Sequence, residues 1–366
     1  MSAETPYLAL DKDKLKANIK DMALFSEKEG VVLRPHVKAH KLRPIADMQM
    51  RAGAVGLTVS KLAEMEVFLS GGIKNIFLAY QLVSRQKIQR MLEITYDAMI
   101  RVAIDNPIHI DILSEIANQR HRQVEVLVEV DTGLQRCGVA TAEEALGLVK
   151  LIKQRDGVLF KGIMTHAGHV YAARSYEQVL QIGEQEGKTM VELADYLDSK
   201  GYCSDVISVG STPTAKISGS IDGVTEIRPG NYVFYDAMQV GLGVVPPERC
   251  ALIVCATVIS RAHNDRRLVI DAGSKTLALD KGAHGVEQVK GFGIIKGFPH
   301  LLLERLSEEH GIISVLSDGD IPQVGDQLEI IPNHACPVIN LADRVFIKEK
   351  GRVKESWVID ARGKVQ

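Results

Sequence analysis

The stretch Val31-Val32-Leu33-Arg34-Pro35-His36-Val37-Lys38 is an apolar strand that ends among basic side chains. The first two-thirds of the chain repeat this plan, because short apolar segments alternate with helix-like stretches at residues 14–28, 61–70, 85–94, 142–155 and 176–197. Such alternation is typical of parallel β/α units. Eight strand candidates follow the pattern, at residues 31–36, 55–59, 76–79, 100–104, 124–130, 159–165, 206–209 and 223–234.

Eight β/α units predict an α/β fold built as a (β/α)₈ TIM barrel, with an open doubly wound sheet as the alternative. The position of the polar residues favours the barrel. They gather at the carboxyl ends of the strand candidates, the rim on which barrel enzymes carry their chemistry. These rim residues are Lys38, Gln81, Asp105, Asp131, His166, Gly210 and Gly230.

The helical rhythm fades after residue 242, and short strand-like segments separated by turn residues take its place. They lie at residues 252–258, 267–270, 312–316, 327–331, 344–347 and 355–359. We therefore expect two units, a barrel over residues 1–242 and a smaller C-terminal β domain over residues 243–366.

Composition narrows the class of protein. The chain has 366 residues and a net charge of −2, which gives no electrostatic reason to expect nucleic acid or an anionic membrane as a partner. No apolar run is long enough to span a bilayer, and the first residues lack the pattern of a signal peptide. Five cysteines without CxxC spacing indicate reduced thiols, so a cytoplasmic location is predicted.

Lys38 is the first candidate for chemistry. A lysine in a basic loop is usually a surface residue, but this one directly follows an apolar strand, with Arg34, His36, His40 and Lys41 around it. Neighbouring cationic groups lower the pKa of a lysine. The pattern thus favours an amine that is neutral near pH 7 and able to form a Schiff base.

Two segments near the last two barrel strands have the composition of an anion site. Gly210-Ser211-Thr212-Pro213-Thr214 follows the seventh candidate, and Arg228-Pro229-Gly230-Asn231 lies in the eighth. Small and hydroxyl residues present backbone N–H and O–H donors, and barrels often bind phosphate after strands seven and eight. Ordinary turn chemistry is the alternative for either segment alone. The pair predicts a phosphate site.

Other rim residues favour a pocket for a ring. His166 and Tyr171 lie on a glycine-containing turn after the sixth strand candidate. After the fifth, Arg136 can neutralise a carboxylate or a phenolate. Asp131 precedes it, with helix capping as the simpler explanation.

The run Pro332-Asn333-His334-Ala335-Cys336 follows the apolar strand candidate at 327–331. Residues two apart on a strand face the same side, so His334 and Cys336 are placed to bind one ion. Two protein ligands are too few for a structural zinc site, but together with water and substrate they would make an open, catalytic site, and an imidazole with a thiolate prefers zinc over magnesium or calcium. A buried thiol beside a hydrogen-bonded histidine is the alternative.

These motifs, in this order, resemble the fold type III pyridoxal-phosphate enzymes of the D-serine dehydratase and D-threonine aldolase group. The resemblance implies an alanine-racemase-like barrel with a C-terminal β domain, in a head-to-tail homodimer. It implies that Lys38 carries pyridoxal 5'-phosphate and that Gly210, Ser211, Thr212, Gly230 and Asn231 hold the phosphate. It further implies that Tyr171 reaches the pyridine nitrogen, that His166 lies near the ring, and that His334 and Cys336 bind the metal. Zinc is the first choice, with manganese or magnesium as alternatives.

A metal that polarises a β-oxygen predicts a D-3-hydroxy amino acid as substrate of a pyridoxal-phosphate-dependent lyase. Two reactions compete: dehydration to a 2-oxo acid and ammonia, as in D-serine dehydratases, and retro-aldol cleavage to glycine and an aldehyde, as in D-threonine aldolases. The His-x-Cys pair resembles the dehydratases, because many aldolases of the group carry His-Cys-Asp, so dehydration is favoured. A racemase is disfavoured, because alanine racemases supply their second base as a tyrosine of the C-terminal domain and no tyrosine follows Tyr235 in this chain. The non-enzyme alternative is a small pyridoxal-phosphate-binding protein of cofactor homeostasis. Such proteins lack a C-terminal domain and the metal pair, so residues 243–366 argue against this class.

Overall fold

The computed structural model describes residues 3–262, 266–282 and 289–366. Its first sheet contains the eight predicted parallel strands, in the order β2-β9-β8-β7-β6-β5-β4-β3. A parallel bridge between His36 and Thr58 joins the two end strands, as does a hydrogen bond from Val55 N to Leu33 O of 3.0 Å. These contacts close the sheet, so the predicted (β/α)₈ barrel is confirmed rather than an open sheet.

The barrel strands are shorter at the closure than the sequence predicted. Only two residues of β2 and two of β9 pair as strands, because the chain turns into 3₁₀ helices soon after each. The bounds are β2 (Val32–Leu33), β3 (Leu57–Val59), β4 (Asn75–Leu78), β5 (Met99–Ile104), β6 (Val124–Val130), β7 (Val158–Thr165), β8 (Val206–Val209) and β9 (Glu226–Ile227).

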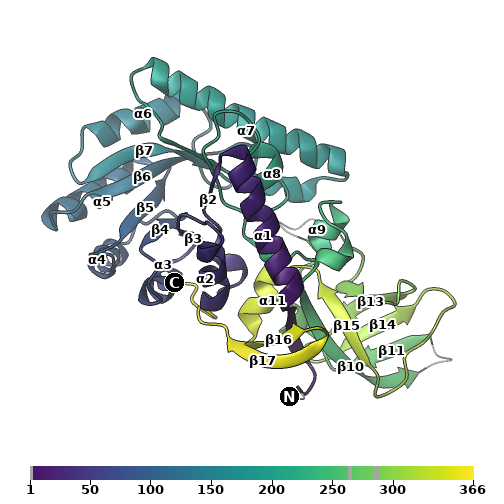
Figure 1. Ribbon diagram of the computed structural model, residues 1–366. Coiled ribbons are helices and arrows are strands. Elements are labelled where there is room, and N and C mark those ends of the chain that lie inside the picture. Colours follow the sequence, from purple (N-terminus) through teal and green to yellow (C-terminus); the bar gives the residue numbers. More distant parts are fainter. Residues whose placement is uncertain (1–2, 263–265, 283–288) are drawn as a thin grey trace.

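Helices surround the barrel (Figure 1). Their ends are set by local chemistry: Thr141 and Glu144 form a capping box at the start of α6, and Asn106 caps α5 ahead of a proline. Four of these helices, α2, α5, α8 and α9, were not predicted from the sequence. The bounds are α1 (Lys12–Glu29), α2 (Arg43–Arg51), α3 (Leu62–Ser70), α4 (Arg85–Ile94), α5 (Pro107–Gln119), α6 (Ala142–Lys153), α7 (Tyr176–Ser199), α8 (Ala215–Ser218) and α9 (Ala237–Gly241).

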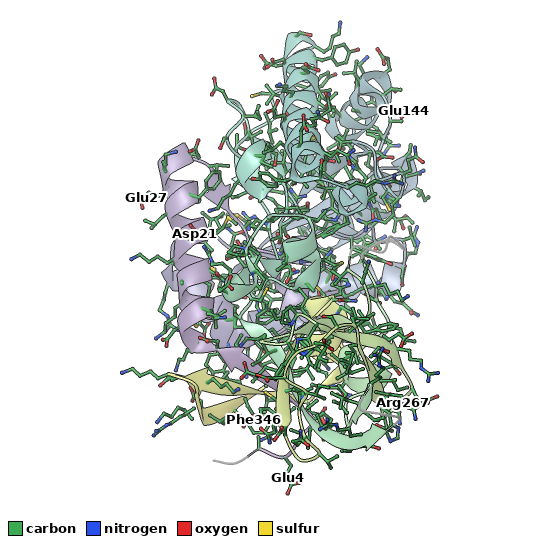
Figure 2. All side chains as sticks on the ribbon, turned by 90° about the vertical axis from the view of Figure 1, so that its right-hand side faces the viewer. Glu4, Asp21, Glu27, Glu144, Arg267 and Phe346 are labelled. Atoms are coloured by element: carbon green, nitrogen blue, oxygen red, sulfur yellow. The ribbon has the colours of Figure 1, made fainter. Side chains whose placement is uncertain are left out.

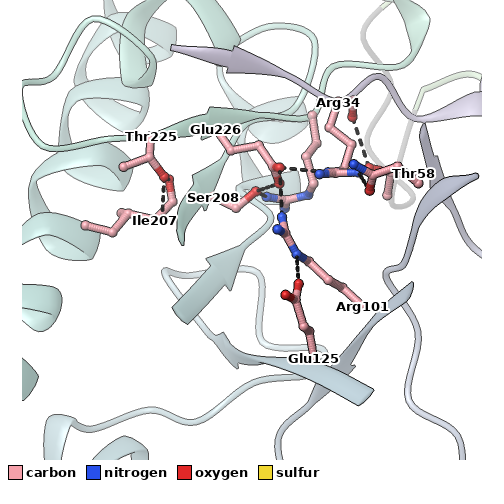
Figure 3. A network of polar contacts seen from close by, with 10 residues as sticks. Arg34, Thr58, Arg101, Glu125, Ile207, Ser208, Thr225 and Glu226 are labelled. Carbon is pink, nitrogen blue, oxygen red and sulfur yellow. Dashed lines mark hydrogen bonds and ion pairs between the residues drawn. The ribbon is translucent and has the colours of Figure 1, made fainter. Parts of the chain in front are cut away.

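The barrel interior is charged as well as apolar (Figure 3). Glu226 lies at its centre and is almost fully buried. It accepts a hydrogen bond from Arg34 Nε (2.7 Å) and one from Ser208 Oγ (2.6 Å), and Arg101 Nη1 lies 3.5 Å away. Buried charges need such partners to offset the loss of hydration. On the wall, Gly162 allows β7 to approach β8, because a Cβ there would lie 2.0 Å from Val206 O.

A second sheet of nine strands forms the other unit, seen below the barrel in Figures 1 and 2. The six predicted C-terminal strands are present, joined by β12, β13 and β1. In Figure 2, Phe346 and Arg267 mark this sheet and Glu144 marks the barrel. The strands are β1 (Tyr7–Asp11), β10 (Leu252–Ala262), β11 (Arg267–Ile270), β12 (Gly293–Ile295), β13 (Leu301–Leu306), β14 (Gly311–Val315), β15 (Gln327–Pro332), β16 (Arg344–Glu349) and β17 (Arg352–Val358).

The N-terminal strand departs from the predicted division at residue 242. Although β1 comes first in the chain, it pairs with β10 and β16 and so lies in the second sheet. Burial of apolar side chains accounts for this position, because Leu8, Ala9 and Leu10 are buried in that sheet. From β1, helix α1 leads to β2 and contacts elements of both units. Four short 3₁₀ helices, η1 (Val37–Ala39), η2 (Gly168–Ala172), η3 (Asn231–Val233) and η4 (Pro247–Arg249), and helices α10 (Ser274–Leu277) and α11 (Ala335–Leu341) complete the described fold.

Within the ranges that the structure describes, no helix is long and apolar enough to cross a membrane.

Candidate active site

A cavity of about 610 Å³ lies between the carboxyl ends of the barrel strands and the second unit. Its wall includes every residue singled out from the sequence as catalytic, cofactor-binding or metal-binding. A larger hollow of about 920 Å³ between α1, β2 and α2 contains none of them. The predicted residues that line the first cavity are Lys38, Arg136, His166, Tyr171, Gly210, Ser211, Thr212, Gly230, Asn231, His334 and Cys336.

Lys38 lies on η1, the single turn that follows β2. The side chain of His36 begins this turn, because its Nδ1 accepts a hydrogen bond from Lys38 N at 3.4 Å. Burial lowers the pKa of the Lys38 amine. Cys336 opposes this shift, whereas Arg136 and Arg228 lower the pKa further. The neutral form that Schiff-base chemistry requires is therefore favoured.

The cause of this lowered pKa differs from the sequence-based expectation. Three basic neighbours of Lys38 in the chain are engaged elsewhere. Arg34 turns into the barrel interior, and Lys41 pairs with the buried Glu64 at 2.8 Å. His40 is buried, and burial lowers its pKa to about 3, so that it carries no charge at neutral pH. The effective cations, Arg136 and Arg228, come from other strands.

Helix α7 holds the loop after β8 in place. Glu186 of this helix is buried, and its Oε1 accepts a hydrogen bond from Gly210 N (2.9 Å). The hydroxyl of Ser211 lies 3.2 Å from Thr214 Oγ1, and Thr212 Oγ1 accepts a hydrogen bond from Tyr232 N of η3, the turn after β9, at 3.2 Å. Ser211 and Thr212 therefore lie in fixed positions on the cavity wall.

The loop after β9 approaches η1 closely at Gly230. A Cβ at this position would lie 2.8 Å from His36 O, so only glycine fits without displacement. Next to it, the side-chain amide of Asn231 donates to Asp236 Oδ2 at 2.6 Å. This bond engages one of the two amide hydrogens and fixes the Asn231 side chain.

His166, Tyr171 and Arg136 come from the loops after β7 and β6. His166 lies directly after β7 and lines the cavity. The Tyr171 hydroxyl accepts a hydrogen bond from Gln239 Nε2 at 3.3 Å, and burial raises the pKa of Tyr171, which keeps the phenol protonated. Arg136 is exposed at the mouth of the cavity.

Asp131 neither lines the cavity nor caps the helix that follows it. Its Oδ1 accepts hydrogen bonds from Gly133 N (2.8 Å) and Gln135 N (3.1 Å), so it shapes its own loop. The next helix, α6, is capped by Thr141 instead. The loop that Asp131 shapes carries Arg136.

His334 and Cys336 meet for a different reason from the one expected. Strand β15 ends at Pro332, so the two residues do not share a strand face. His334 is the extended residue that precedes α11, and Cys336 lies in the first turn of that helix. They still form a pair, because the His334 ring is hydrogen-bonded to Cys336. Helix α11 also contacts η1, which brings the pair to the turn that carries Lys38.

A carboxylate fixes the orientation of the imidazole. His334 Nδ1 lies 2.6 Å from Asp280 Oδ2, so Nδ1 is engaged and Nε2 is the nitrogen left to bind an ion. Metal-binding histidines usually have such a partner. Burial alone would lower the pKa of His334, but Cys336 and Asp280 raise it to about 10, because negative groups surround the ring. The described residues contain no group of three or more His, Cys, Asp or Glu with metal-binding geometry, so the candidate site rests on this pair.

Sequence reasoning gave no role of their own to four polar residues of this region. Arg228, named only as part of the predicted phosphate segment, and Glu129 line the cavity, and each is a charged residue near the carboxyl end of a buried strand. Burial raises the pKa of Glu129. Asp280 and Asp236 lie in loops and have no local signal, because their partners are far away in the sequence.

Comparisons with known proteins agree with this geometry. The family described as alanine racemase, N-terminal domain, matches residues 10–237, and a putative serine dehydratase domain matches residues 251–348. D-threonine aldolase of Arthrobacter sp. is 32% identical over 98% of this chain and 93% of its own length. D-threo-3-hydroxyaspartate dehydratase of Delftia sp. (strain HT23) is 33% identical over 92% of each chain.

The chain belongs to the fold type III pyridoxal-phosphate enzymes of the D-serine dehydratase and D-threonine aldolase family. A solved structure of D-threo-3-hydroxyaspartate dehydratase, a cysteine-to-alanine mutant in the metal-free form, superimposes with a TM-score of 0.90 at 31% identity and covers 98% of this chain and 97% of that chain. The predicted family, fold class and enzyme class, a pyridoxal-phosphate-dependent lyase, are confirmed.

The cavity of this family member fits the cofactor. It is within the usual volume range of small-molecule sites. It offers a lysine whose pKa is lowered by burial, and buried hydroxyls for a phosphate beside the glycine at which two loops approach closely. The individual roles of these residues toward pyridoxal phosphate stay predictions.

Proposed function

We propose that this lyase is a metal-dependent dehydratase of D-3-hydroxy amino acids, which it converts to a 2-oxo acid and ammonia. The observation that carries the proposal is that Lys38 and the His334–Cys336 pair face one cavity. A base for the Cα proton and a site for the β-hydroxyl are both needed for β-elimination, and this cavity offers candidates for each.

The chain's own residues supply the following steps. Bound pyridoxal phosphate draws electrons from the bond that breaks at Cα. Lys38 Nζ, whose pKa is lowered by burial and by Arg136 and Arg228, takes the Cα proton. His334 and Cys336 would hold a divalent metal, which supplies Lewis-acid polarisation of the β-hydroxyl as it leaves. Asp280 holds the His334 ring in the orientation that this requires.

The phosphate of the cofactor is assigned to the loops after β8 and β9. Ser211 and Thr212 offer hydroxyl donors, and Gly230 and Asn231 offer backbone N–H groups on the facing side. Arg136 at the mouth would neutralise a carboxylate or the cofactor phenolate. His166 and Tyr171 border the space left for the ring.

Retro-aldol cleavage is the second candidate, because one similar protein is a D-threonine aldolase. It needs a base that takes the β-hydroxyl proton. Two considerations favour dehydration. The second metal-binding candidate is a thiol, Cys336, where many aldolases of the family have a carboxylate, and another similar protein is a dehydratase. A soft thiolate also supports zinc as the metal, with manganese or magnesium as alternatives.

Incubation with D-threonine separates the two reactions. A dehydratase gives 2-oxobutanoate and ammonia, whereas an aldolase gives glycine and acetaldehyde. We expect the first pair of products, and no glycine. L-threonine is the control for the predicted D-specificity. Glycine and acetaldehyde as the main products would replace the proposed reaction with retro-aldol cleavage.

The homodimer and the cytoplasmic location are also proposed. The support for a head-to-tail pair is the family resemblance, which predicts that the partner's β domain completes each active site. Light scattering on the purified chain should give twice the chain mass of 40.1 kDa. A monomer with full activity would contradict the shared site.

A further inference from the structure

The strongest unexplained feature of the active-site region is Asp236, a fully buried carboxylate that lies between the two candidate sites. Its Oδ2 accepts hydrogen bonds from Asn231 Nδ2 at 2.6 Å and from Ala335 N at 2.9 Å. Asn231 belongs to the proposed phosphate loop. Ala335 stands between His334 and Cys336. One oxygen atom therefore links both loops.

The surroundings of Asp236 strengthen this link. Its Oδ1 accepts a hydrogen bond from Gln239 N at 3.2 Å, which fixes the carboxylate at the start of α9. Gln239 in turn donates to the Tyr171 hydroxyl, on the wall of the same cavity. Met238 N donates to Asn333 O at 3.2 Å, one residue before the metal pair. The segment after η3 thus holds the loop before α11 in place.

A buried carboxylate is costly, and it is retained here by three N–H donors. A helix cap alone needs only the bond to Gln239 N. Of the other two bonds, both on Oδ2, the one from Asn231 stays within the barrel and the one from Ala335 N comes from the β domain. We propose that Asp236 is a positioning residue that couples cofactor binding to metal binding. When the phosphate orders the loop of Asn231, the shared oxygen holds Ala335 N, and the His334–Cys336 pair is preorganised.

Coupling of this kind has a measurable consequence. If pyridoxal phosphate tightens metal binding by some factor, the metal must tighten pyridoxal phosphate binding by the same factor. A merely structural role for Asp236 would weaken each ligand separately and leave this factor unchanged. The inference rests on the proposed metal pair, and the experiment below separates the failure of one from the failure of the other.

The test measures Zn²⁺ binding by calorimetry to the full-length protein, stripped of cofactor and metal, with and without saturating pyridoxal phosphate. In the wild type we expect the cofactor to tighten Zn²⁺ binding on the order of tenfold, within the usual range of coupling between sites. In Asp236→Asn the ratio should fall at least about threefold, because an amide places a donor where the carboxylate accepts two hydrogen bonds.

Glu186→Gln is the matched control. Glu186 is also a buried carboxylate, and it also holds a phosphate loop through Gly210 N, but its second bond goes to Ala167 N in the barrel. This variant should weaken cofactor binding and keep the wild-type ratio. If Asp236→Asn does not fold by circular dichroism, Asn231→Ala tests the same link from its other end, and the ratio should fall there too.

Each remaining outcome is decisive. A wild-type ratio near one, or a ratio that survives in Asp236→Asn or in Asn231→Ala, overturns the coupling while leaving the metal pair intact. Equal loss of the ratio in Glu186→Gln also overturns it, because the effect would not be specific to Asp236. Failure of the wild type to bind Zn²⁺ in either state overturns the metal pair itself.

Discussion

The Lys38 turn and the His334–Cys336 turn line the same cavity, but they are held in different ways. Lys38 follows β2, and its position is set by the β-ladder contacts that close the barrel. The metal pair follows β15, and its position depends on two side chains, Asp280 and Asp236, that are 54 and 99 residues away from their partners. The first turn is fixed by repeated backbone pairing, the second by single long-range hydrogen bonds.

This difference predicts how each half of the site responds to substitution of a single side chain. Loss of one side chain in the barrel half removes chemistry but leaves the frame, because strand pairing continues around it. Loss of one carboxylate in the other half leaves the ligand present but badly oriented. The effects of substitution should therefore be abrupt in the first half and graded in the second.

The largest effect is expected for Lys38→Ala. Without the amine, the cofactor has no covalent attachment and the Cα proton has no base, so activity should fall by at least about 10³-fold. Borohydride reduction followed by peptide mapping should label Lys38 in the wild type and leave the variant unlabelled. A label on Lys41 or Lys61 would show that the wrong lysine was assigned.

The same comparison explains what the sequence could predict. The eight barrel strands and the predicted site residues around Lys38 were found because each unit repeats the pattern of an apolar strand followed by polar residues. The barrel places all strand ends at one rim, so residues far apart in the chain had to meet. The spacing argument for His334 and Cys336 was wrong in its physical basis, since a helix begins between them. Both residues nevertheless line the same cavity as Lys38.

Single tertiary contacts could not be predicted. The cations that lower the pKa of Lys38 are Arg136 and Arg228, whereas the sequence pointed to Arg34, His36, His40 and Lys41. Side-chain direction decides this, and one sequence does not give it. Likewise β1 joins the second sheet because its pairing partners β10 and β16 lie more than two hundred residues later.

The next largest effect should follow removal of a metal-binding side chain. Cys336→Ala leaves one candidate ligand, so we expect activity to fall by about 10²-fold or more, with the fold and the bound cofactor retained. Metal content by mass spectrometry and cofactor absorbance check both points. Chelation of the wild type should have the same effect, and added Zn²⁺ should restore activity. Cys203→Ala, an exposed thiol, is the control and should behave as wild type. Full activity with no metal present would exclude the metal role.

A graded effect is expected for Asp280→Asn. The amide can keep a hydrogen bond to His334 Nδ1 but removes the negative charge, so the ring stays near its position with weaker orientation. Outer partners of metal-binding histidines typically contribute 10- to 100-fold in metal affinity, and we expect a loss of about tenfold. Asp343→Asn, at an exposed carboxylate between α11 and β16, should leave Zn²⁺ affinity unchanged. Equal affinities in all three proteins would show that Asp280 does not orient the ligand.

The smallest effect should be a shift in the pH dependence of Lys38. Arg136 is one of the cations that lower the pKa of this amine, and it lies exposed at the cavity mouth, where water screens its charge. In Arg136→Met the positive charge is gone, so the ammonium form is less disfavoured and the Lys38 pKa should rise, by less than about one unit. Labelling of the cofactor-free protein with an amine-reactive reagent, followed at Lys38 by mass spectrometry, gives this pKa directly. The midpoint should move to higher pH in Arg136→Met and stay unchanged in Arg174→Met, an exposed arginine on the η2–α7 loop. A shift to lower pH would mean that Arg136 acts on Lys38 through another group rather than by its charge.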